Sequence, residues 1–438
     1  MINRNYWILG LIWVFANSMF AQEISNKSTL KQLINSALEN NYLLQANEKN
    51  VFIKQAEIEI LKTNYQPKIS TSLNFSYWKF LLPNKQKLLG DNGLSDMYTD
   101  ISIYQTIYDW GENKLKKSVV EDEIKLNDDI KRQIRNTIIW GVYDAYFEAQ
   151  KIESEIAALQ NASKQLKSHL QYANNLYKIG RVSNIDVLKI NLQIAVVEKD
   201  LKKAQNQYLS QEIKIKSLCH LDDNKSLEME NTSEIHYNNS KNILFPQDFL
   251  YTEVIQNHPV LLAANKKITM ESKQKDIYSL QNRPEFFSYG IGSWEHAYIP
   301  FGDNFNYNIG LGISYTLPFW GGSSYKSNVL KSNMRVEQLN DEKNQLFIDI
   351  KKEIDLELNA IIDIKEEIAN NEKIIELANE TLNNALIKYQ AGLGPVIDVL
   401  DAQTIVTETT IAHQKSIIAF LQSVGNLNYL IGNDNYPF

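Results

Sequence analysis

The sequence is poor in cysteine, proline and glycine, and these shortages limit the folds that it can adopt. Cys219 is the single cysteine among 438 residues, so the chain cannot form an intramolecular disulfide and packing must stabilise it. Only nine prolines and 17 glycines are present, which leaves long stretches in which nothing interrupts a helix. The composition therefore favours long helices held together by side-chain packing.

Charge and motif content exclude several functional classes. The chain has 45 Lys and Arg against 52 Asp and Glu and no basic block, which argues against nucleic acid as a partner. Its six histidines are scattered without a zinc-protease motif, and no Gly-x-Ser-x-Gly elbow occurs. We therefore predict that the protein is not an enzyme, and we predict no catalytic residue, cofactor or metal site.

Residues 1–21 have the features of a secretory signal peptide. Arg4 precedes an apolar run at residues 7–15, and Ala21 offers a cleavage site after a small residue. The run is too short for a transmembrane helix, and no cysteine follows the cut to accept a lipid. We expect the mature chain to be exported without a lipid anchor at its new end.

A duplicated motif indicates that the chain is a tandem repeat. The second copy reads Tyr389-Gln-Ala-Gly-Leu-Gly-Pro-Val-Ile-Asp-Val-Leu-Asp-Ala402, and the first, 212 positions earlier, reads Tyr177-Lys-Ile-Gly-Arg-Val-Ser-Asn-Ile-Asp-Val-Leu-Lys-Ile190. In each copy a glycine that can adopt positive φ ends one helical pattern, and Ile-Asp-Val-Leu opens the next. Each copy is therefore predicted to form a helix–turn–helix tip.

The duplication extends over nearly the whole mature chain. Pro67 recurs as Pro284, and Trp110-Gly111 recurs as Trp320-Gly321. We predict a helix, a β-hairpin, a long helix, a tip and a second helix in each half. The predicted ranges are 22–218 for the first repeat, 219–245 for an equatorial linker, 246–438 for the second repeat, about 68–109 and 285–318 for the hairpins, and 177–186 and 389–401 for the tips.

The helical patterns are long. Apolar spacing predicts a first helix from about Thr29 to Asn64. After each Trp-Gly pair a longer helix is expected, at about 112–178 and 324–390, which at ~1.5 Å per residue makes a rod of roughly 100 Å. Shorter helices should follow the tips at about 184–218 and 396–431. Narrow apolar stripes between charged residues indicate that each helix packs along one face and exposes another face to solvent.

Between the helices the apolar pattern changes to a period of two. Phe287, Tyr289 and Ile291 alternate with small residues, and the run from Phe305 to Leu317 has seven apolar residues on one face and six small or polar ones on the other. This pattern indicates strands with lipid outside and water inside, although a strand of a water-soluble sandwich is the alternative. Four strands cannot close a membrane barrel, so we predict that three chains share a barrel of twelve.

The signal peptide, the two half-repeats, the Trp-Gly pairs and above all the tip motif resemble the TolC-type outer-membrane efflux proteins, the outer membrane factor family. The resemblance implies a mainly α protomer with four strands, and a homotrimer whose 12-stranded transmembrane β-barrel continues into a periplasmic α-helical barrel. It also implies a place in the outer membrane of a Gram-negative bacterium, in contact with its lipid. The implied protein partners are a periplasmic membrane-fusion adaptor and an inner-membrane pump of the RND type.

The resemblance assigns a periplasmic gate to the second tip. Asp398 and Asp401 match family aspartates that face the channel axis, and Tyr389 matches a tyrosine that ties the closed tip to a neighbouring helix. Independently, the i, i+3 spacing puts both carboxylates on one helical face, and three chains would form a ring that favours cations. The alternative is that these acids only stabilise a helix start.

The first tip has a different start to its second helix. Ser183 and Asp186 are spaced as a capping box, and we prefer this role for Asp186. Lys189 stands where the second tip has its second aspartate, and it can pair with Asp186. The acidic pair is therefore expected only in the second repeat.

The tip turns match the family region that meets the adaptor. By this resemblance Gly180, Val182, Gly392 and Leu393 are candidate docking residues, and turning the chain is the alternative role of the two glycines. Gly394 occupies a position where family members can carry an arginine that latches the gate, so the latch is expected to be built differently here.

The expected function is that of an outer-membrane exit duct in a tripartite efflux system, which passively conducts small molecules from pump and adaptor to the exterior. A conduit for type I protein secretion and a periplasmic coiled-coil protein that is not a channel are the alternatives. The coiled-coil alternative explains the helices and leaves the lipid-facing strands unexplained. The sequence does not indicate the cargo.

Overall fold

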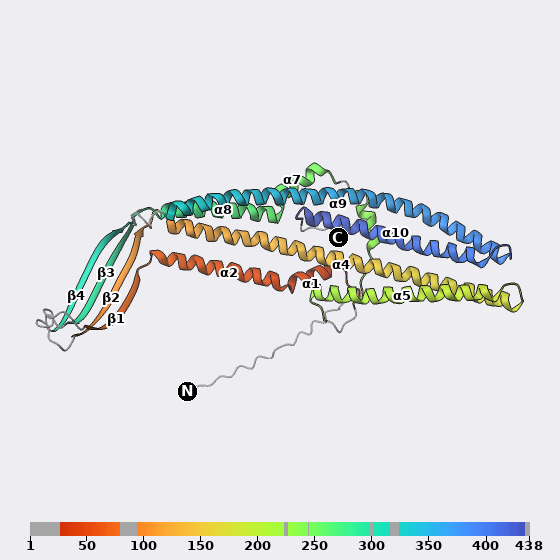
Figure 1. Cartoon of the computed structure of the whole chain (residues 1–438), viewed down its shortest axis with the longest axis horizontal. Coiled ribbons are helices and arrows are strands. Elements are labelled where there is room, and N and C mark those ends of the chain that lie inside the picture. The colour runs from red at the N-terminus through yellow and green to blue at the C-terminus, as the bar shows by residue number, and fades with distance from the viewer. Residues whose placement is uncertain are drawn as a thin grey trace, which may run out of the picture.

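A computed structural model shows an elongated molecule with a β-sheet at one end and two helical tips at the other (Figure 1). The signal peptide and the Trp320-Gly321 pair that the sequence predicts lie outside the residues that the structure describes. The described residues are 27–78, 94–222, 227–243, 245–297, 302–315 and 324–433.

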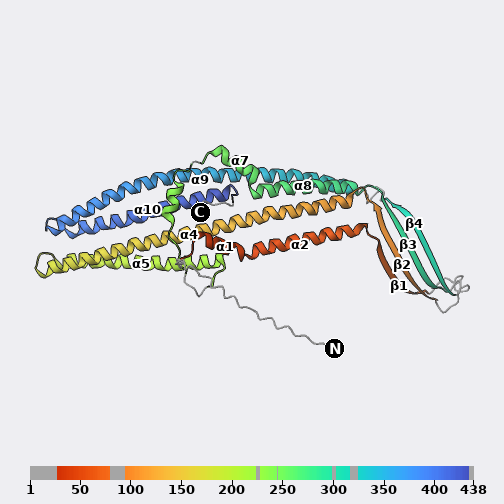
Figure 2. The same cartoon turned by 180° about the vertical axis from the view of Figure 1, so that it is seen from behind.

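Two helices of 67 residues extend from the sheet to the tips, α4 (Glu112–Lys178) and α9 (Ser324–Gln390) (Figure 1). Near the sheet they are accompanied by α2 (Tyr42–Lys62) and α8 (Pro259–Leu280), and near the tips by α5 (Asn184–Cys219) and α10 (Val396–Leu430), as Figures 1 and 2 show. The expected mainly α protomer with four strands is confirmed.

The prediction of one helix from Thr29 to Asn64 is wrong. The structure has α1 (Leu30–Glu39), then α2, then a short 3-10 turn at Thr63–Tyr65. The side chain of Asn41 accepts hydrogen bonds from the amides of Leu43 and Leu44 at 2.9 and 3.2 Å, so it starts a second helix. The second repeat has the same break, because α7 (Gln247–Asn257) ends where Pro259 starts α8.

The four strands form one antiparallel sheet in the order β1-β2-β3-β4. The strands are β1 (Lys68–Trp78), β2 (Leu94–Tyr108), β3 (Glu285–Ala297) and β4 (Gly302–Ser314), so the two hairpins pair through β2 and β3. The outer edges of β1 and β4 have no partner strand among the described residues.

One face of the sheet, here called the apolar face, carries large exposed apolar side chains. Leu311, for example, is 80% exposed. The cross-strand register places these residues together, because directly opposed residues of an antiparallel pair lie on the same face. The apolar face comprises Ile69, Leu73, Phe75, Tyr77, Met97, Ile101, Ile103, Trp294, Phe305, Tyr307, Ile309, Leu311 and Ile313.

The register corrects the expectation for β3. Its Phe287 and Tyr289 lie opposite Gly312 and Gly310, so they are on the other face, here called the polar face, and not beside Leu311. A Cβ atom at Gly312 would come within 2.3 Å of the Phe287 ring, and one at Gly310 within 2.8 Å of the Tyr289 ring. The rings cover the glycines, and this fit decides which way β3 faces.

The main hydrophobic core lies at mid-length, where α1, α4 and α10 meet the linker. Tyr143, Phe147 and Phe420 are fully or almost fully buried there. The hydroxyl of Tyr143 donates to the carbonyl of Leu421 at 3.0 Å, so its one polar atom is satisfied inside the core. This core joins the first repeat to the second.

The inter-repeat linker is held against the helices. Its expected range began at Cys219, but that residue is buried in the last turn of α5, since the helix continues to Cys219. The linker contains α6 (Ser233–Ser240), and Met229 forms a parallel bridge with Ser28. The carbonyl of Glu230 accepts from Gln150 of α4 at 2.9 Å. These contacts form a girdle at mid-length.

His258, the residue before α8, predicts a pH dependence of stability. It is 6% exposed, and burial, with a smaller contribution from Arg132, lowers its pKa to about 4. Between this value and the ordinary value of 6.5 the unfolded chain holds more protons, so stability falls as pH falls through this window. The full loss is about 3 kcal/mol.

The thermal midpoint at pH 7 and at pH 4.5 measures this effect. His258→Gln should reduce the difference between the two pH values, and His169 and His236, whose pKa values burial also lowers, should account for part of what remains. The control is His220→Asn, at an exposed histidine with φ +52 that asparagine tolerates, and it should keep the difference. An unchanged pH dependence in His258→Gln would show that other groups cause it.

Candidate functional site

The two tips end in the same backbone geometry. Gly180 and Gly392 have φ values of +72° and +73°, where other residues are strained. In each turn the glycine amide and the next amide donate to carbonyls of the last helical turn at 2.8–3.0 Å. These paired bonds satisfy the end of the long helix and return the chain antiparallel to it.

The helices that leave the tips start differently. In α5, Ser183 Oγ accepts from the amide of Ile185 at 3.1 Å, and Asp186 Oδ2 accepts from the amide of Ser183 at 3.3 Å, which makes a capping box. Within the described residues, Asp186 and Lys189 form no ion pair. Helix α10 follows Pro395 without a side-chain cap.

Asp398 and Asp401 project from the exposed face of α10. The opposite face of this helix turn is buried through Val399, Leu400 and Ala402. Within the described part of the chain, neither carboxylate has a hydrogen bond or an ion pair. In the isolated protomer the two carboxylates are therefore exposed to solvent and can bind a cation or contact another chain.

The acidic face of α10 extends further than the tip motif. Glu408 is exposed and lies seven residues after Asp401, which puts it on the same helical face about 10 Å along the axis. Glu408 was not predicted from the sequence because it lies beyond the duplicated motif. Its heptad spacing from Asp401 was the available signal.

Tyr389 lies between the two tips and not on the exposed face with the aspartates. It is 6% exposed, and its ring meets Tyr172 of α4 edge-on at a centroid distance of 6.2 Å. Its hydroxyl has no hydrogen-bond partner in the described structure. Burial raises the pKa of Tyr389, and the nearby Asp186 and Tyr172 raise it further. A buried hydroxyl without a hydrogen bond costs free energy, so a small movement of the tips that gave this hydroxyl a hydrogen-bond partner would be favourable.

The two tips share one hydrophobic core. Val187 and Ile190 of α5 pack in the same cluster as Val399 and Leu400 of α10, and Gln193 Nε2 donates to Thr404 Oγ1 at 3.2 Å. A movement of one tip must therefore disturb the other.

The four candidate docking residues are placed differently. Leu393 is 82% exposed, whereas Val182 is partly buried against the shared tip core. Gly180 and Gly392 set the turns. Of the four candidates, Leu393 is thus the one whose apolar side chain is open to solvent.

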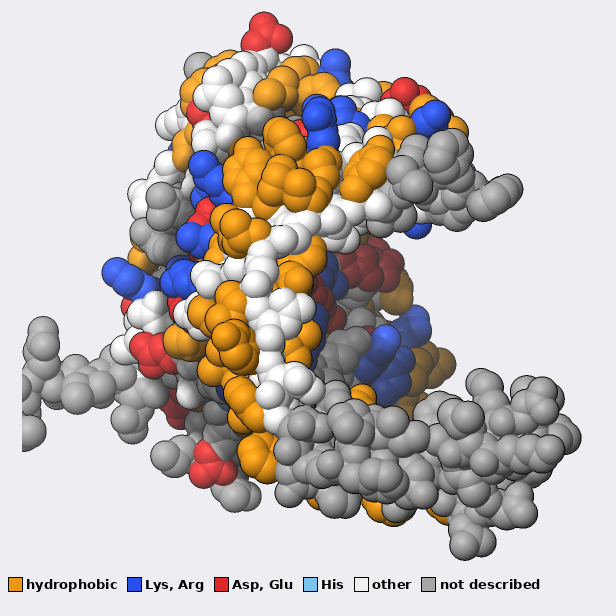
Figure 3. All heavy atoms as spheres, turned by 90° about the vertical axis from the view of Figure 1, so that its left-hand side faces the viewer, with side chains coloured by type: hydrophobic (Ala, Val, Ile, Leu, Met, Phe, Trp, Pro, Cys, Tyr) orange, Lys and Arg blue, Asp and Glu red, His pale blue; other side chains and the backbone are white. Residues whose placement is uncertain are grey.

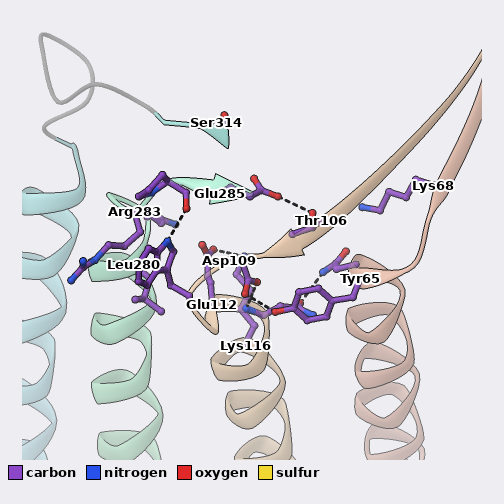
Figure 4. Close-up of a pocket in the computed structure, with 15 residues that line it drawn as sticks. Tyr65, Lys68, Thr106, Asp109, Glu112, Lys116, Leu280, Arg283, Glu285 and Ser314 are labelled. Atoms are coloured by element: carbon purple, nitrogen blue, oxygen red, sulfur yellow. Dashed lines mark hydrogen bonds and ion pairs between the residues drawn. The ribbon is translucent and has the colours of Figure 1, made fainter. Parts of the chain in front are cut away.

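A polar junction connects the sheet to the helices (Figure 4). It surrounds a cavity of about 300 Å³. Trp110 and Gly111 both have positive φ, +58° and +85°, and the indole of Trp110 donates to the carbonyl of Pro284 at 2.7 Å. This conformation explains the Trp-Gly pair: it turns the chain from β2 into α4 while tying the two repeats together.

Side chains around the junction reinforce this turn. Tyr65 donates to Asp109 at 2.5 Å and Thr106 to Glu285 at 2.7 Å, and Asp109 also accepts from the amides of Gly111 and Asn113 (Figure 4). Trp110-Gly111 could be identified from the sequence, whereas Tyr65 and Glu285 could not, because they come from segments far from this pair in the sequence.

Two features are absent from the described residues. No group of three His, Cys, Asp or Glu residues there is arranged to hold a metal ion. No helix in that part of the chain has an apolar stretch that could cross a membrane.

Comparisons with known proteins agree with this architecture. Residues 33–219 match the family described as outer membrane efflux protein. The sequence matches no curated protein. Among solved structures, the described fold resembles CusC, with a TM-score of 0.77 and 14% identity over 92% of each chain.

Two other similar structures come from named organisms. The CmeC outer membrane channel of Campylobacter jejuni has a TM-score of 0.74 and 16% identity over 93% of this chain and 86% of its own. VceC of Vibrio cholerae has the same TM-score and identity, over 93% of this chain and 97% of its own. The match of residues 33–219 and the fold of the described residues confirm the resemblance to the TolC-type outer-membrane efflux proteins that the tip motif indicates.

Proposed function

We propose that three copies of this chain form the outer-membrane exit duct of a tripartite efflux system, through which small molecules pass without energy input from the duct itself. The observation that carries the proposal is the four-stranded sheet with one exposed apolar face, mounted on helical rods of roughly 100 Å. Such a sheet fits lipid, and such rods are long enough to extend well into the periplasm.

The edges of the protomer support a closed ring. In the described part of the chain the outer edges of β1 and β4 have no partner strand, and in lipid such edges must be paired. The helices continue these edges, with α2 and α5 along one side and α9 along the other (Figures 1 and 2). These helices expose apolar side chains suited to contact with a second copy, namely Phe52, Ile53, Ile60, Ile185, Leu188, Leu192, Leu330, Ile348, Leu356 and Ile362.

The tip supports a gate and a docking end. In a trimer Asp398 and Asp401 would supply six carboxylates near the axis at the periplasmic end, where they favour cations. Tyr389, buried beside Tyr172 and close to Asp186, would hold the two tips of a protomer together. Leu393 would meet the periplasmic adaptor, which links the duct to an inner-membrane pump of the RND type.

Current through planar lipid bilayers tests the channel function. Purified mature protein should insert and give discrete conductance steps that favour potassium over chloride. Folded protein that neither inserts nor conducts would favour the periplasmic coiled-coil alternative. A deletion strain then separates cargo classes: accumulation of small toxic compounds supports efflux, and loss of an exported protein alone supports type I secretion.

A further inference from the structure

The polar face of the sheet carries an aromatic patch where polar residues were expected. Most of this face is small or polar, with Ser70, Ser72 and Ser102 on β1 and β2. Near the helices, however, Tyr104 of β2 lies directly opposite Tyr289 of β3, on the same face.

Seen from the sheet end, the molecule curves around a hollow in which charged side chains lie (Figure 3).

The rings form a continuous row across the sheet. Tyr104 stacks on Phe287 with centroids 4.9 Å apart, and Phe287 lies 6.1 Å from Tyr289. Phe287 and Tyr289 in turn cover Gly312 and Gly310 of β4. The row therefore spans three strands, and all three rings remain partly exposed.

One carboxylate lies next to this aromatic row, and a second lies farther along the same face, about 13 Å from Tyr104. Glu285 lies two residues before Phe287 on β3, and Asp100 lies four residues before Tyr104 on β2. Lys68, opposite Tyr104 on β1, is the one basic side chain on this face among the described side chains. Aromatic faces beside net negative charge attract organic cations, because the ring quadrupole and the carboxylates both favour positive charge.

We propose that Tyr104, Phe287 and Tyr289 form a contact site for aromatic organic cations inside the barrel, just above its junction with the helical tunnel. This inference rests on the proposed function, since only a closed barrel turns the polar face toward a water-filled pore. A cation that has passed the acidic tip would meet this site next on its way out.

A pair of variants separates this role from a purely structural one, in which the rings only cover glycines. The test variant is Phe287→Leu with Tyr289→Leu, which keeps an apolar cover over Gly312 and Gly310 and removes the ring faces. The control is Phe305→Leu with Tyr307→Leu, which removes the same ring types from the apolar face of β4. Tyr104→Leu is a second test variant, since Tyr104 covers neither glycine.

The probe is benzyltrimethylammonium, with its saturated cyclohexyl analogue for comparison. Binding to the purified protein is followed by saturation-transfer NMR, and block of potassium current is followed in bilayers. Because each ring face contributes about two- to fivefold to cation binding, the double test variant should weaken binding and block by the benzyl probe about five- to twentyfold. The control should match the parent. The saturated analogue keeps the ammonium group and lacks only the ring of the probe, so its block should weaken in the test variants, but less than that of the benzyl probe.

Two outcomes overturn the proposal. Equal binding of the benzyl probe by the parent and both test variants would show that the rings have only a structural role. Equal weakening in the control would show that the effect comes from general loss of aromatic side chains. If binding follows the expected pattern while the parent carries no current, the aromatic site stands and the proposed channel function fails.

Discussion

Replacement of both Asp398 and Asp401 by alanine should remove most of the cation preference of the channel and raise its conductance severalfold. Both carboxylates are exposed on one face of α10 and have no partner in the described protomer. Three chains would bring six negative charges to the narrow end of the tunnel, where a ring of carboxylates concentrates cations and binds divalent ions. Reversal potentials in a potassium chloride gradient, with and without magnesium, measure both effects.

A matched control removes the same number of charges away from the tip. Glu234→Ala with Asp248→Ala changes two exposed acids of the mid-length helices α6 and α7, and it should leave selectivity unchanged. If the tip variant inserts as an intact assembly and behaves like the parent, the constriction lies elsewhere. The aspartates would then serve only as first-turn acids of α10.

Replacement of Gly425 by valine should destabilise the protein by about 3 kcal/mol. Gly425 lies in α10, where a Cβ atom would come 2.3 Å from Cε1 of Tyr143 and 3.0 Å from Cζ3 of Trp140. Tyr143 cannot easily retreat, because it is buried and its hydroxyl is bonded to the carbonyl of Leu421. The crowded core would have to shift both rings or separate α4 from α10.

The control for this variant is the helical glycine Gly141 in α4. No atom lies within 4 Å of a Cβ added there, so Gly141→Ala should be neutral or stabilising by up to about 1 kcal/mol. Thermal unfolding in detergent compares the two variants with the parent. Equal midpoints for Gly425→Val and the parent would contradict the tight packing described at this crossing.

Local features of the fold could be read from the sequence. The long helices and the tips follow from helical spacing that a glycine ends, and the structure has Glu112–Lys178 and Ser324–Gln390 where helices were expected at about 112–178 and 324–390. The break at Asn41 was missed because apolar spacing continues across it. An asparagine whose side chain caps the next helix was the available signal.

Features that depend on partners from distant segments could not be predicted. The direction of β3 depends on the pairing of Phe287 with Gly312, and alternation within one strand does not say which of its faces joins that of the next strand. The burial of Tyr389 depends on Tyr172, more than 200 residues earlier in the chain. The junction around Trp110 likewise needs Pro284 from the other repeat.

The number of chains in the detergent-solubilised particle tests the central claim most directly. The described sheet has two edges without a partner strand, so one chain cannot enclose a pore and several copies are required. With four strands per chain, three copies give a barrel of twelve strands. Native mass spectrometry of the mature protein should show three chains per particle, stable to dilution. A folded particle of one chain would contradict the account, because no closed barrel and no ring of aspartates could then form.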